Sequence, residues 1–204
     1  MRREEKTRIS YQEILQAALI EFGMHDYSEV SLNSICSQHD LSKGLFYHYF
    51  SGKDEVFLSC VREVFSELIS VLQQSCFTDM EKESENLINR YFQTRNTFFA
   101  AHPLYQRIFS NAVFQCPAHL RNQVAQLRKP LQELNHKLIQ KMASNLDLRE
   151  SVSISDAEKY FNQFDEIFQF LLTRYQQPDT GIDQIEPLTR KLLDLMLYGI
   201  AQQK

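Results

Sequence analysis

Apolar residues recur at intervals of three and four along nearly the whole chain, and this periodicity constrains the fold more than any other feature. Such spacing forms an apolar stripe on an α-helix, whereas a half-buried β-strand needs strict alternation, which is absent over any length. Glycine and proline, the residues that break helices, occur only five times each in 204 residues. The sequence therefore predicts an all-α protein of about nine helices.

Three short helices fit within the first fifty residues. Ser10 followed by Glu13 has the pattern of a capping box, which predicts a first helix that starts at Ser10 and ends near Met24. Ser31 and Ser42 suit the caps of a second and a third helix, because a serine hydroxyl accepts a hydrogen bond from the first turn. Longer apolar stripes predict further helices at about 53–75, 81–101, 103–113, 117–144, 155–175 and 184–202.

Composition and charge limit the classes of function. The chain is 43% hydrophobic, which is ample for a buried core, and no apolar run approaches the roughly 18 to 20 residues of a membrane span. The polar start MRREEKTRIS lacks the apolar segment of a secretory signal, so we expect a cytoplasmic protein with no membrane contact. The net charge is −4, so any nucleic-acid contact must come from a local patch.

Motifs of catalysis and metal binding are absent from the sequence. There is no glycine-rich phosphate loop, no GxSxG and no HExxH, and the six histidines are scattered. The four cysteines form no CxxC pair. We therefore expect no enzyme activity, no cofactor and no metal, and we leave the redox role of the cysteines open.

The stretch SKGLFYHYF at residues 42–50 has two different helical faces. At 100° per residue, Phe46 and Phe50 lie on one side and can pack on the first helix. The other side carries Lys43, Gly44, Tyr47 and His48, with Leu45 at its edge. This pattern is typical of a recognition helix that enters the DNA major groove, although an amphipathic helix with a solvated face has the same spacing.

Residues around this stretch resemble the DNA-binding domain of the TetR family of bacterial transcriptional regulators. That domain has a first helix ending in Phe, a Ser or Thr at the start of helix two, and a segment close to SKGTLYHHF followed by a lysine. This chain matches the spacing with Phe22, Tyr27, Ser31, Ile35, Leu41, SKGLFYHYF at 42–50, and Lys53.

The resemblance implies a three-helix helix-turn-helix DNA-binding domain at residues 1–52 and a helical effector-binding and dimerisation domain at 53–204. It also implies DNA contacts from three segments: the start of helix two, the recognition helix, and the start of helix four, where a lysine binds phosphate. The residues at these positions are Ser31, Asn33, Ser42, Lys43, Gly44, Leu45, Tyr47, His48 and Lys53.

Three positions depart from the family pattern. Asp26 and Asp40 stand where the family usually has turn glycines, so we expect both to adopt the left-handed backbone region, which Asp tolerates better than most residues. Leu45 stands where the family commonly has Thr, which exchanges a hydrogen bond for an apolar contact such as a thymine methyl. The operator sequence therefore does not follow from the resemblance.

The last two predicted helices have apolar stripes wider than one core contact requires, and the earlier of them has a further capping-box pattern at Ser155 and Glu158. Wide stripes at the end of a chain favour a two-fold four-helix dimer interface, although they can also close the core of a monomer. The residues we expect at the interface are Phe161, Phe164, Phe168, Leu172, Leu188, Leu192, Leu195 and Met196.

Aromatic residues are dense between positions 91 and 114, which suits an apolar effector pocket with a few polar groups that orient the ligand. Aromatic stripes at helical spacing also form ordinary cores, so the lining residues are candidates only. The candidates are Phe92, Asn96, Phe99, His102, Tyr105, Phe109, Phe164 and Phe168.

Together these features predict a homodimeric DNA-binding regulator, a repressor released from a near-palindromic operator by a small apolar or aromatic effector. Activation instead of repression is equally compatible with the sequence. The alternative with the same fold is a helical adaptor whose C-terminal domain binds a protein partner instead of a small molecule.

Overall fold

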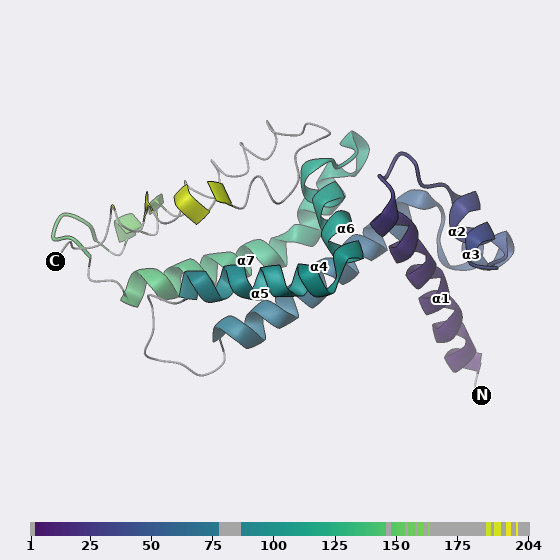
Figure 1. The fold of residues 1–204 in the computed structure, drawn as a ribbon, viewed down its shortest axis with the longest axis horizontal. Coiled ribbons are helices and arrows are strands. Elements are labelled where there is room, and N and C mark those ends of the chain that lie inside the picture. Colours follow the sequence, from purple (N-terminus) through teal and green to yellow (C-terminus); the bar gives the residue numbers. More distant parts are fainter. Residues whose placement is uncertain are drawn as a thin grey trace. The chain divides into compact units, whose positions relative to one another are not determined.

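The structure, a computed structural model, describes residues 3–77, 87–145, 148–153, 155–157, 159–160, 163, 187–188, 190–192, 195–196 and 199. Its fold is all-α, as predicted (Figure 1). The helices are α1 (Arg3–Met24), α2 (Leu32–Gln38), α3 (Lys43–Tyr49), α4 (Lys53–Phe77), α5 (Leu87–Ala101), α6 (Pro103–Phe114), the 3-10 helix η2 (Ala118–Leu120) and α7 (Arg121–Asn145).

Two compact units divide the chain. The first comprises residues 1–68 and 96–128, and the second comprises residues 69–95 and 129–204. The helices α4, α5 and α7 each contribute residues to both units. The domain boundary that the sequence predicts at residue 53 coincides with the first residue of α4, and it stays a prediction.

Aromatic side chains form the core of the first unit. Phe22 of α1 contacts Phe57 of α4, with ring centroids 5.0 Å apart, and both rings are fully buried. Phe46 and Phe50 lie inward from α3 and are also buried, with ring centroids 5.6 Å apart. The helices α1, α2 and α3 therefore pack on one another and on the start of α4 around a common aromatic core (Figure 1).

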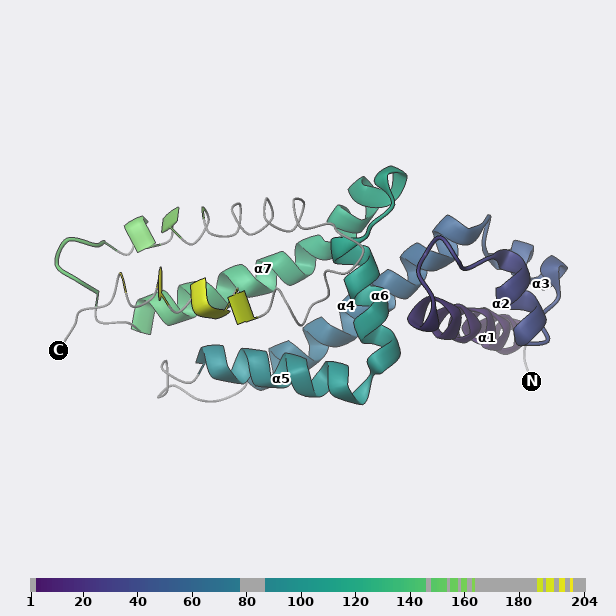
Figure 2. The same cartoon turned by 45° about the horizontal axis from the view of Figure 1, so that its top comes forward.

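The second unit has a smaller apolar cluster where three helices meet. Cys76 at the end of α4 and Leu87 at the start of α5 pack with Leu138 and Met142 of α7. Figure 2 shows the helices α4, α5 and α7 that carry these residues. A hydrogen bond of 2.6 Å between Ser75 and Thr94 side chains links α4 and α5. These contacts hold together chain segments that are far apart in sequence.

Two predicted capping boxes are wrong. The first helix begins at Arg3, so Ser10 lies inside α1, because the preceding residues are mostly Glu, Lys and Arg, which are strong helix formers. The box predicted at Ser155 lies two residues earlier: the Asp156 N–H donates to Ser153 Oγ at 3.1 Å, and the Ser153 N–H donates to Asp156 Oδ2 at 3.2 Å. The predicted helices at 155–175 and 184–202 lie mostly outside the described residues.

Candidate nucleic-acid interface

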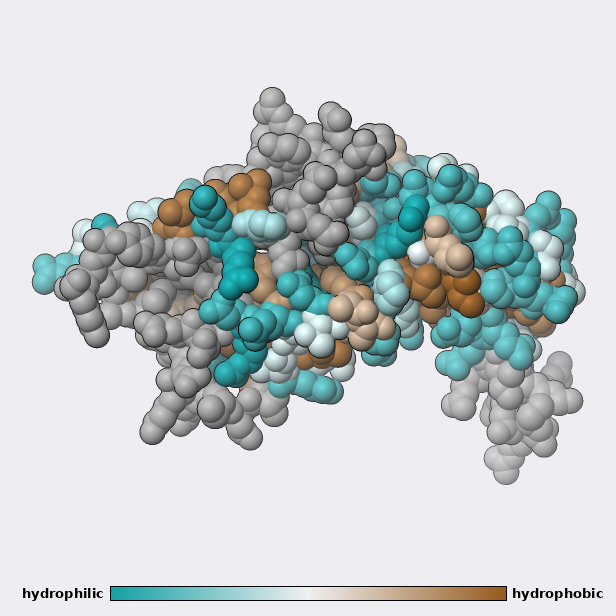
Figure 3. Space-filling view, viewed as in Figure 1, coloured by the Kyte–Doolittle hydropathy of each residue, from teal (hydrophilic) through white to brown (hydrophobic). Residues whose placement is uncertain are grey.

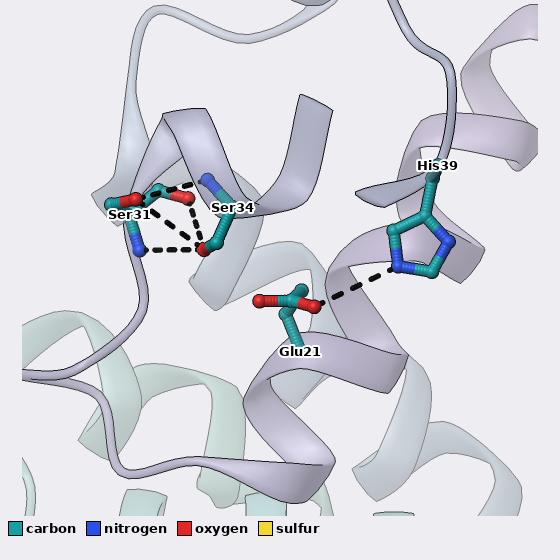
Figure 4. A network of polar contacts seen from close by, with 4 residues as sticks. All are labelled: Glu21, Ser31, Ser34 and His39. Atoms are coloured by element: carbon teal, nitrogen blue, oxygen red, sulfur yellow. Dashed lines mark hydrogen bonds and ion pairs between the residues drawn. The ribbon is translucent and has the colours of Figure 1, made fainter. Parts of the chain in front are cut away.

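A reciprocal capping box fixes the start of α2, as predicted for Ser31. Ser31 Oγ accepts from the Ser34 N–H at 3.0 Å, and Ser34 Oγ accepts from the Ser31 N–H at 3.1 Å (Figure 4). The backbone N–H groups of Ser31 and Ser34 thus both have hydrogen-bond acceptors within the chain. Ser31 and Asn33 remain exposed, so both stay accessible to a DNA backbone or base edge.

The turn between α2 and α3 is built on Asp40. Its φ of 54° is in the left-handed region, as predicted, and the Leu41 N–H donates to the Cys36 carbonyl at 2.9 Å. This bond is typical of a Schellman motif, which ends a helix and redirects the chain. The same prediction is wrong for Asp26, because there the Glu29 carboxylate accepts from the Asp26 N–H at 2.9 Å and closes the turn without a positive φ.

The exposure of α3 confirms the division of faces predicted from the sequence. Ser42 Oγ accepts from the Leu45 N–H at 3.1 Å and caps the helix, while Phe46 is fully buried. Tyr47 is 58% exposed and Leu45 is half-buried. The exposed set is Ser42, Lys43, Gly44, Tyr47 and His48.

Gly44 has open space beside it. A Cβ built at this position meets no heavy atom within 4 Å. The surface over α2 and α3 that faces the viewer in Figure 3 is mostly hydrophilic. An exposed helix with basic and hydroxyl groups and one bare backbone position is suited to lie close to DNA.

Lys53, the predicted phosphate contact, is the first residue of α4 and is half-buried. Its Nζ lies 4.2 Å from the centroid of the Tyr27 ring. Burial lowers the pKa of Lys53, and the neighbouring Asp54 carboxylate opposes this shift. The carboxylate of Glu55 accepts from the Ser51 N–H at 2.7 Å and so fixes the start of α4.

Three residues beside Lys53 were not predicted as part of the site. Asp54 accepts a hydrogen bond from the Tyr27 hydroxyl, and its second oxygen lies 3.0 Å from His119 Nε2. His119 is in η2, which is 65 residues from Asp54 in sequence. Its i, i+3 spacing from Cys116 is a weak metal pattern, and no sequence signal pairs it with Asp54.

The candidate effector residues fall in both units. In the first unit, the Phe109 ring lies 5.2 Å from Phe99 and 5.6 Å from Phe65 between centroids. In the second unit, Phe92 is buried beneath the Arg95 guanidinium, which lies 5.3 Å from the ring centroid.

Polar candidates for the effector site are placed differently from the phenylalanines. Asn96 and His102 are exposed, and Tyr105 is half-buried with its ring 5.3 Å from the His102 ring. Phe164 and Phe168 lie outside the described residues. The role of this set as a pocket stays a prediction.

Among the predicted dimer residues, Leu188 and Leu195 are 44% and 57% exposed. Leu192 and Met196 are half-buried, and Met196 packs with Ala157. The other four, Phe161, Phe164, Phe168 and Leu172, lie outside the described residues. Their role at an interface stays a prediction.

The described residues also bear on metal sites and on membrane-spanning helices. Within these ranges there is no group of three or more His, Cys, Asp or Glu side chains placed to hold a metal ion. Among the described helices none is both long and apolar enough to span a membrane.

Sequence comparison matches the region that contains this interface. Residues 14–60 match the family model described as bacterial regulatory proteins, tetR family. The transposon Tn10 TetC protein of Escherichia coli is 30% identical over 60 residues, which are 29% of this chain and 30% of that protein. The chain thus matches less than a third of that curated relative. The match to a family of regulatory proteins agrees with the prediction that the chain is not an enzyme.

Structural comparison extends over nearly the whole chain. The fatty acid degradation regulator FadR from Bacillus halodurans has a TM-score of 0.66 at 16% identity, covering 95% of this chain and 97% of that one. The regulator FadR from Bacillus subtilis, solved in complex with stearoyl-CoA, has a TM-score of 0.64 at 16% identity, covering 93% and 99%. At this identity the likeness shows a common fold. Residues 14–60 thus match the tetR family of bacterial regulatory proteins, and the chain as a whole shares the fold of these two solved regulators.

Proposed function

We propose that this chain is a dimeric DNA-binding transcription regulator that acts in the cytoplasm as a repressor released by a small apolar effector. The exposed face of α3 carries this proposal. Lys43, Gly44 and Tyr47 project from a helix that is capped at Ser42 and fixed from behind by the buried Phe46. Two such helices in a dimer would enter successive major grooves about 34 to 36 Å apart.

Exposed apolar residues of the second unit support dimerisation. Leu188 and Leu195 are both helical residues, and their separation of seven positions is the spacing of residues on one face of an α-helix. Tyr160, 47% exposed, is a further large apolar side chain open to solvent in this unit. A two-fold interface would cover such a face with a second copy of itself.

The contact between α1 and α6 supports control by an effector. The aromatic cluster of Phe65, Phe99 and Phe109 joins α4, α5 and α6, and α6 also packs on α1 of the DNA-binding helices. A ligand that moves α6 would therefore act on α1 directly. A difference of 1 to 3 kcal/mol in ligand affinity between two states would weaken operator binding about 5- to 150-fold.

The chemistry of the effector is suggested by composition and by one neighbour of the same fold. The side chains of the cluster are apolar, and FadR from Bacillus subtilis has been solved with stearoyl-CoA. We therefore propose an apolar ligand and place fatty acyl-CoA thioesters first in a screen. Release of operator DNA by one of them, measured by anisotropy, would identify the ligand class.

Operator binding is the first test. Anisotropy with labelled DNA from upstream of the gene, against a scrambled duplex, should show sequence-specific binding of two subunits per site. Lys43→Ala and Tyr47→Ala should weaken it, whereas Lys137→Ala, which removes an exposed lysine from α7, should not. Equal binding to both duplexes at micromolar protein would contradict the proposal.

The oligomeric state separates this reading from the adaptor alternative. Leu195→Asp should convert the protein to a monomer in sedimentation experiments without loss of helical circular dichroism, because it places a charge in an apolar interface. A wild-type protein that is monomeric at micromolar concentration would instead favour an adaptor that uses the exposed leucines to bind a different protein.

A further inference from the structure

Lys53 is held in place by an aromatic ring. Its ammonium group lies 4.2 Å from the centroid of Tyr27, which belongs to the segment between α1 and α2. A free lysine side chain has many rotamers, and fixing them costs entropy whenever the amine binds a phosphate. The cation–π contact with Tyr27 restricts the amine before DNA arrives, so less entropy is lost when the amine binds a phosphate.

Tyr27 is in turn fixed by Asp54. The Tyr27 hydroxyl donates to Asp54 Oδ1, and burial together with this hydrogen bond raises the pKa of Tyr27, so the phenol keeps its proton. The Tyr27 ring also packs on Phe57, with centroids 4.9 Å apart. The Tyr27 ring beneath Lys53 is therefore held both by its packing on Phe57 and by the hydrogen bond of its hydroxyl.

His119 engages the second oxygen of Asp54. Nε2 lies 3.0 Å from Oδ2, and because an ionised carboxylate only accepts hydrogen bonds, Nε2 carries the proton. Both oxygens of the Asp54 carboxylate thus have partners other than Lys53, which is the preceding residue in the sequence. If either partner is lost, Asp54 gains a free acceptor next to the lysine amine.

We propose that Tyr27, Asp54 and His119 are positioning residues that hold Lys53 toward a DNA phosphate, and that η2 controls this contact through His119. The inference rests on the proposed DNA-binding function and adds three residues to it. Since only residues 115–117 separate η2 from α6 in the chain, a movement of α6 and η2 would withdraw His119, release Asp54 toward Lys53 and weaken the phosphate contact.

Salt dependence of operator binding tests the proposal, because it counts phosphate contacts. The logarithm of the binding constant falls with the logarithm of salt concentration by about 0.9 per phosphate, hence by about 1.8 for one lysine in each of two subunits. Lys53→Ala should flatten the slope by about this amount. His119→Ala should flatten it in the same direction, and the double variant should be no flatter than Lys53→Ala alone.

A conservative variant provides the control. His119→Gln keeps a side-chain N–H that can reach Asp54, so it should restore most of the wild-type slope. Thermal unfolding of each variant shows whether the fold is intact. If His119→Ala does not fold, the salt slopes of the wild type, His119→Gln and Lys53→Ala provide the test. A salt slope for His119→Gln as flat as that of Lys53→Ala would then contradict the proposal.

The outcomes separate this inference from the function on which it rests. If the wild type does not distinguish operator from scrambled DNA, the proposed function fails. Specific binding by the wild type and a flatter salt slope for Lys53→Ala would support the proposed function. The positioning role would be wrong if His119→Ala then had the wild-type slope. It would also be wrong if the double variant had a flatter slope than Lys53→Ala alone.

Discussion

Gly44 is the position on α3 where the chain itself leaves the most room, since an added Cβ meets nothing within 4 Å. Its role therefore concerns what lies outside the monomer. In the proposed complex, in which α3 enters the major groove, a methyl group here would stand between the helix backbone and the floor of the groove. The residue is a test of DNA contact that is separate from folding.

Gly44→Ala should have opposite effects on stability and binding. Alanine is the better helix former, so the free energy of unfolding should rise by about 0.5 to 1 kcal/mol. Operator affinity should fall roughly tenfold or more, equivalent to at least about 1.4 kcal/mol. Urea denaturation and anisotropy measure the two effects, and unchanged affinity would show that α3 does not approach DNA closely at this position.

Glu21 is an unusual residue for the core of the DNA-binding helices, because it is only 2% exposed. His39, at the end of α2, points toward it with Nε2 3.8 Å from Glu21 Oε1, and Nε2 makes no hydrogen bond among the described residues (Figure 4). Buried carboxylates need a partner, since an unpaired one costs desolvation energy.

His39→Ala should lower the free energy of unfolding by about 1 to 3 kcal/mol, because it leaves Glu21 buried without its partner. The double variant Glu21→Leu with His39→Ala should recover most of that loss, since it also removes the buried carboxylate that His39→Ala alone leaves without a partner. Urea denaturation of the wild type, Glu21→Leu, His39→Ala and the double variant measures the coupling. Losses that simply add in the double variant would show that the two residues do not interact.

At the scale of elements, the contact of α1 with α6 joins the DNA-binding helices to the rest of the first unit. Arg107 of α6 forms an ion pair with Asp26 at 3.0 Å, and the buried Asn111 Nδ2 lies 3.5 Å from the His25 carbonyl oxygen. The two helices also lie very close at Gly23, where an added Cβ would lie 2.6 Å from Leu104 Cβ and 2.9 Å from its Cα. Only a residue without a side chain fits there.

Gly23→Ala should therefore destabilise the protein by about 1 to 3 kcal/mol through overpacking, because the backbone of α6 has to move. Gly52→Ala is the matched control, since a Cβ at that position meets nothing within 4 Å. Thermal unfolding of the two variants should differ clearly. Equal stability would show that α1 and α6 separate easily.

The start of α4 should make stability depend on pH. Hydrogen bonds from the Ser51 N–H and hydroxyl lower the pKa of Glu55. A carboxyl group whose pKa is lower in the folded state contributes stability above its unfolded pKa of about 4.3 and loses it as pH falls through the folded pKa.

Glu55→Gln should consequently be less stable than the wild type near pH 6, and the difference should shrink as pH falls below about 4. Urea denaturation across this range measures it. A difference that is constant with pH would mean that the charge of Glu55 does not matter and that only its hydrogen-bonding shape does.

At the scale of the whole molecule, the cysteines answer a question that the sequence left open. All four, Cys36, Cys60, Cys76 and Cys116, are free and buried. Burial raises the pKa of each thiol, that of Cys116 to about 11. Since the thiolate is the reactive form, these cysteines are suited to packing and not to redox sensing.

Alkylation should confirm this. At neutral pH the native protein should react with iodoacetamide slowly at all four cysteines, and all four should react rapidly in denaturant. Mass spectrometry counts the labels. Rapid labelling of a single cysteine in the native protein would indicate a reactive thiol and reopen a redox role.

Local sequence signals predicted much of the interface. The serine caps at Ser31 and Ser42, the turn at Asp40 and the inward position of Phe46 follow from rules that involve residues within a few positions of one another. The same kind of reasoning failed at Ser10, where helix formers extend α1, and at Asp26, where Glu29 closes the turn. In both cases neighbouring residues stabilise a backbone conformation that differs from the predicted one.

The sequence by itself determined the all-α fold, the exposed face of α3 and the match of residues 14–60 to the tetR family, because periodicity, caps and motifs are local properties of the chain. Only the tertiary structure decided that His119 meets Asp54, that Glu21 meets His39 and that Gly23 touches Leu104. These contacts join segments from 18 to 81 positions apart in sequence. Which residues meet in these contacts depends on how the helices pack, and the local spacing of residues in the sequence does not determine that packing.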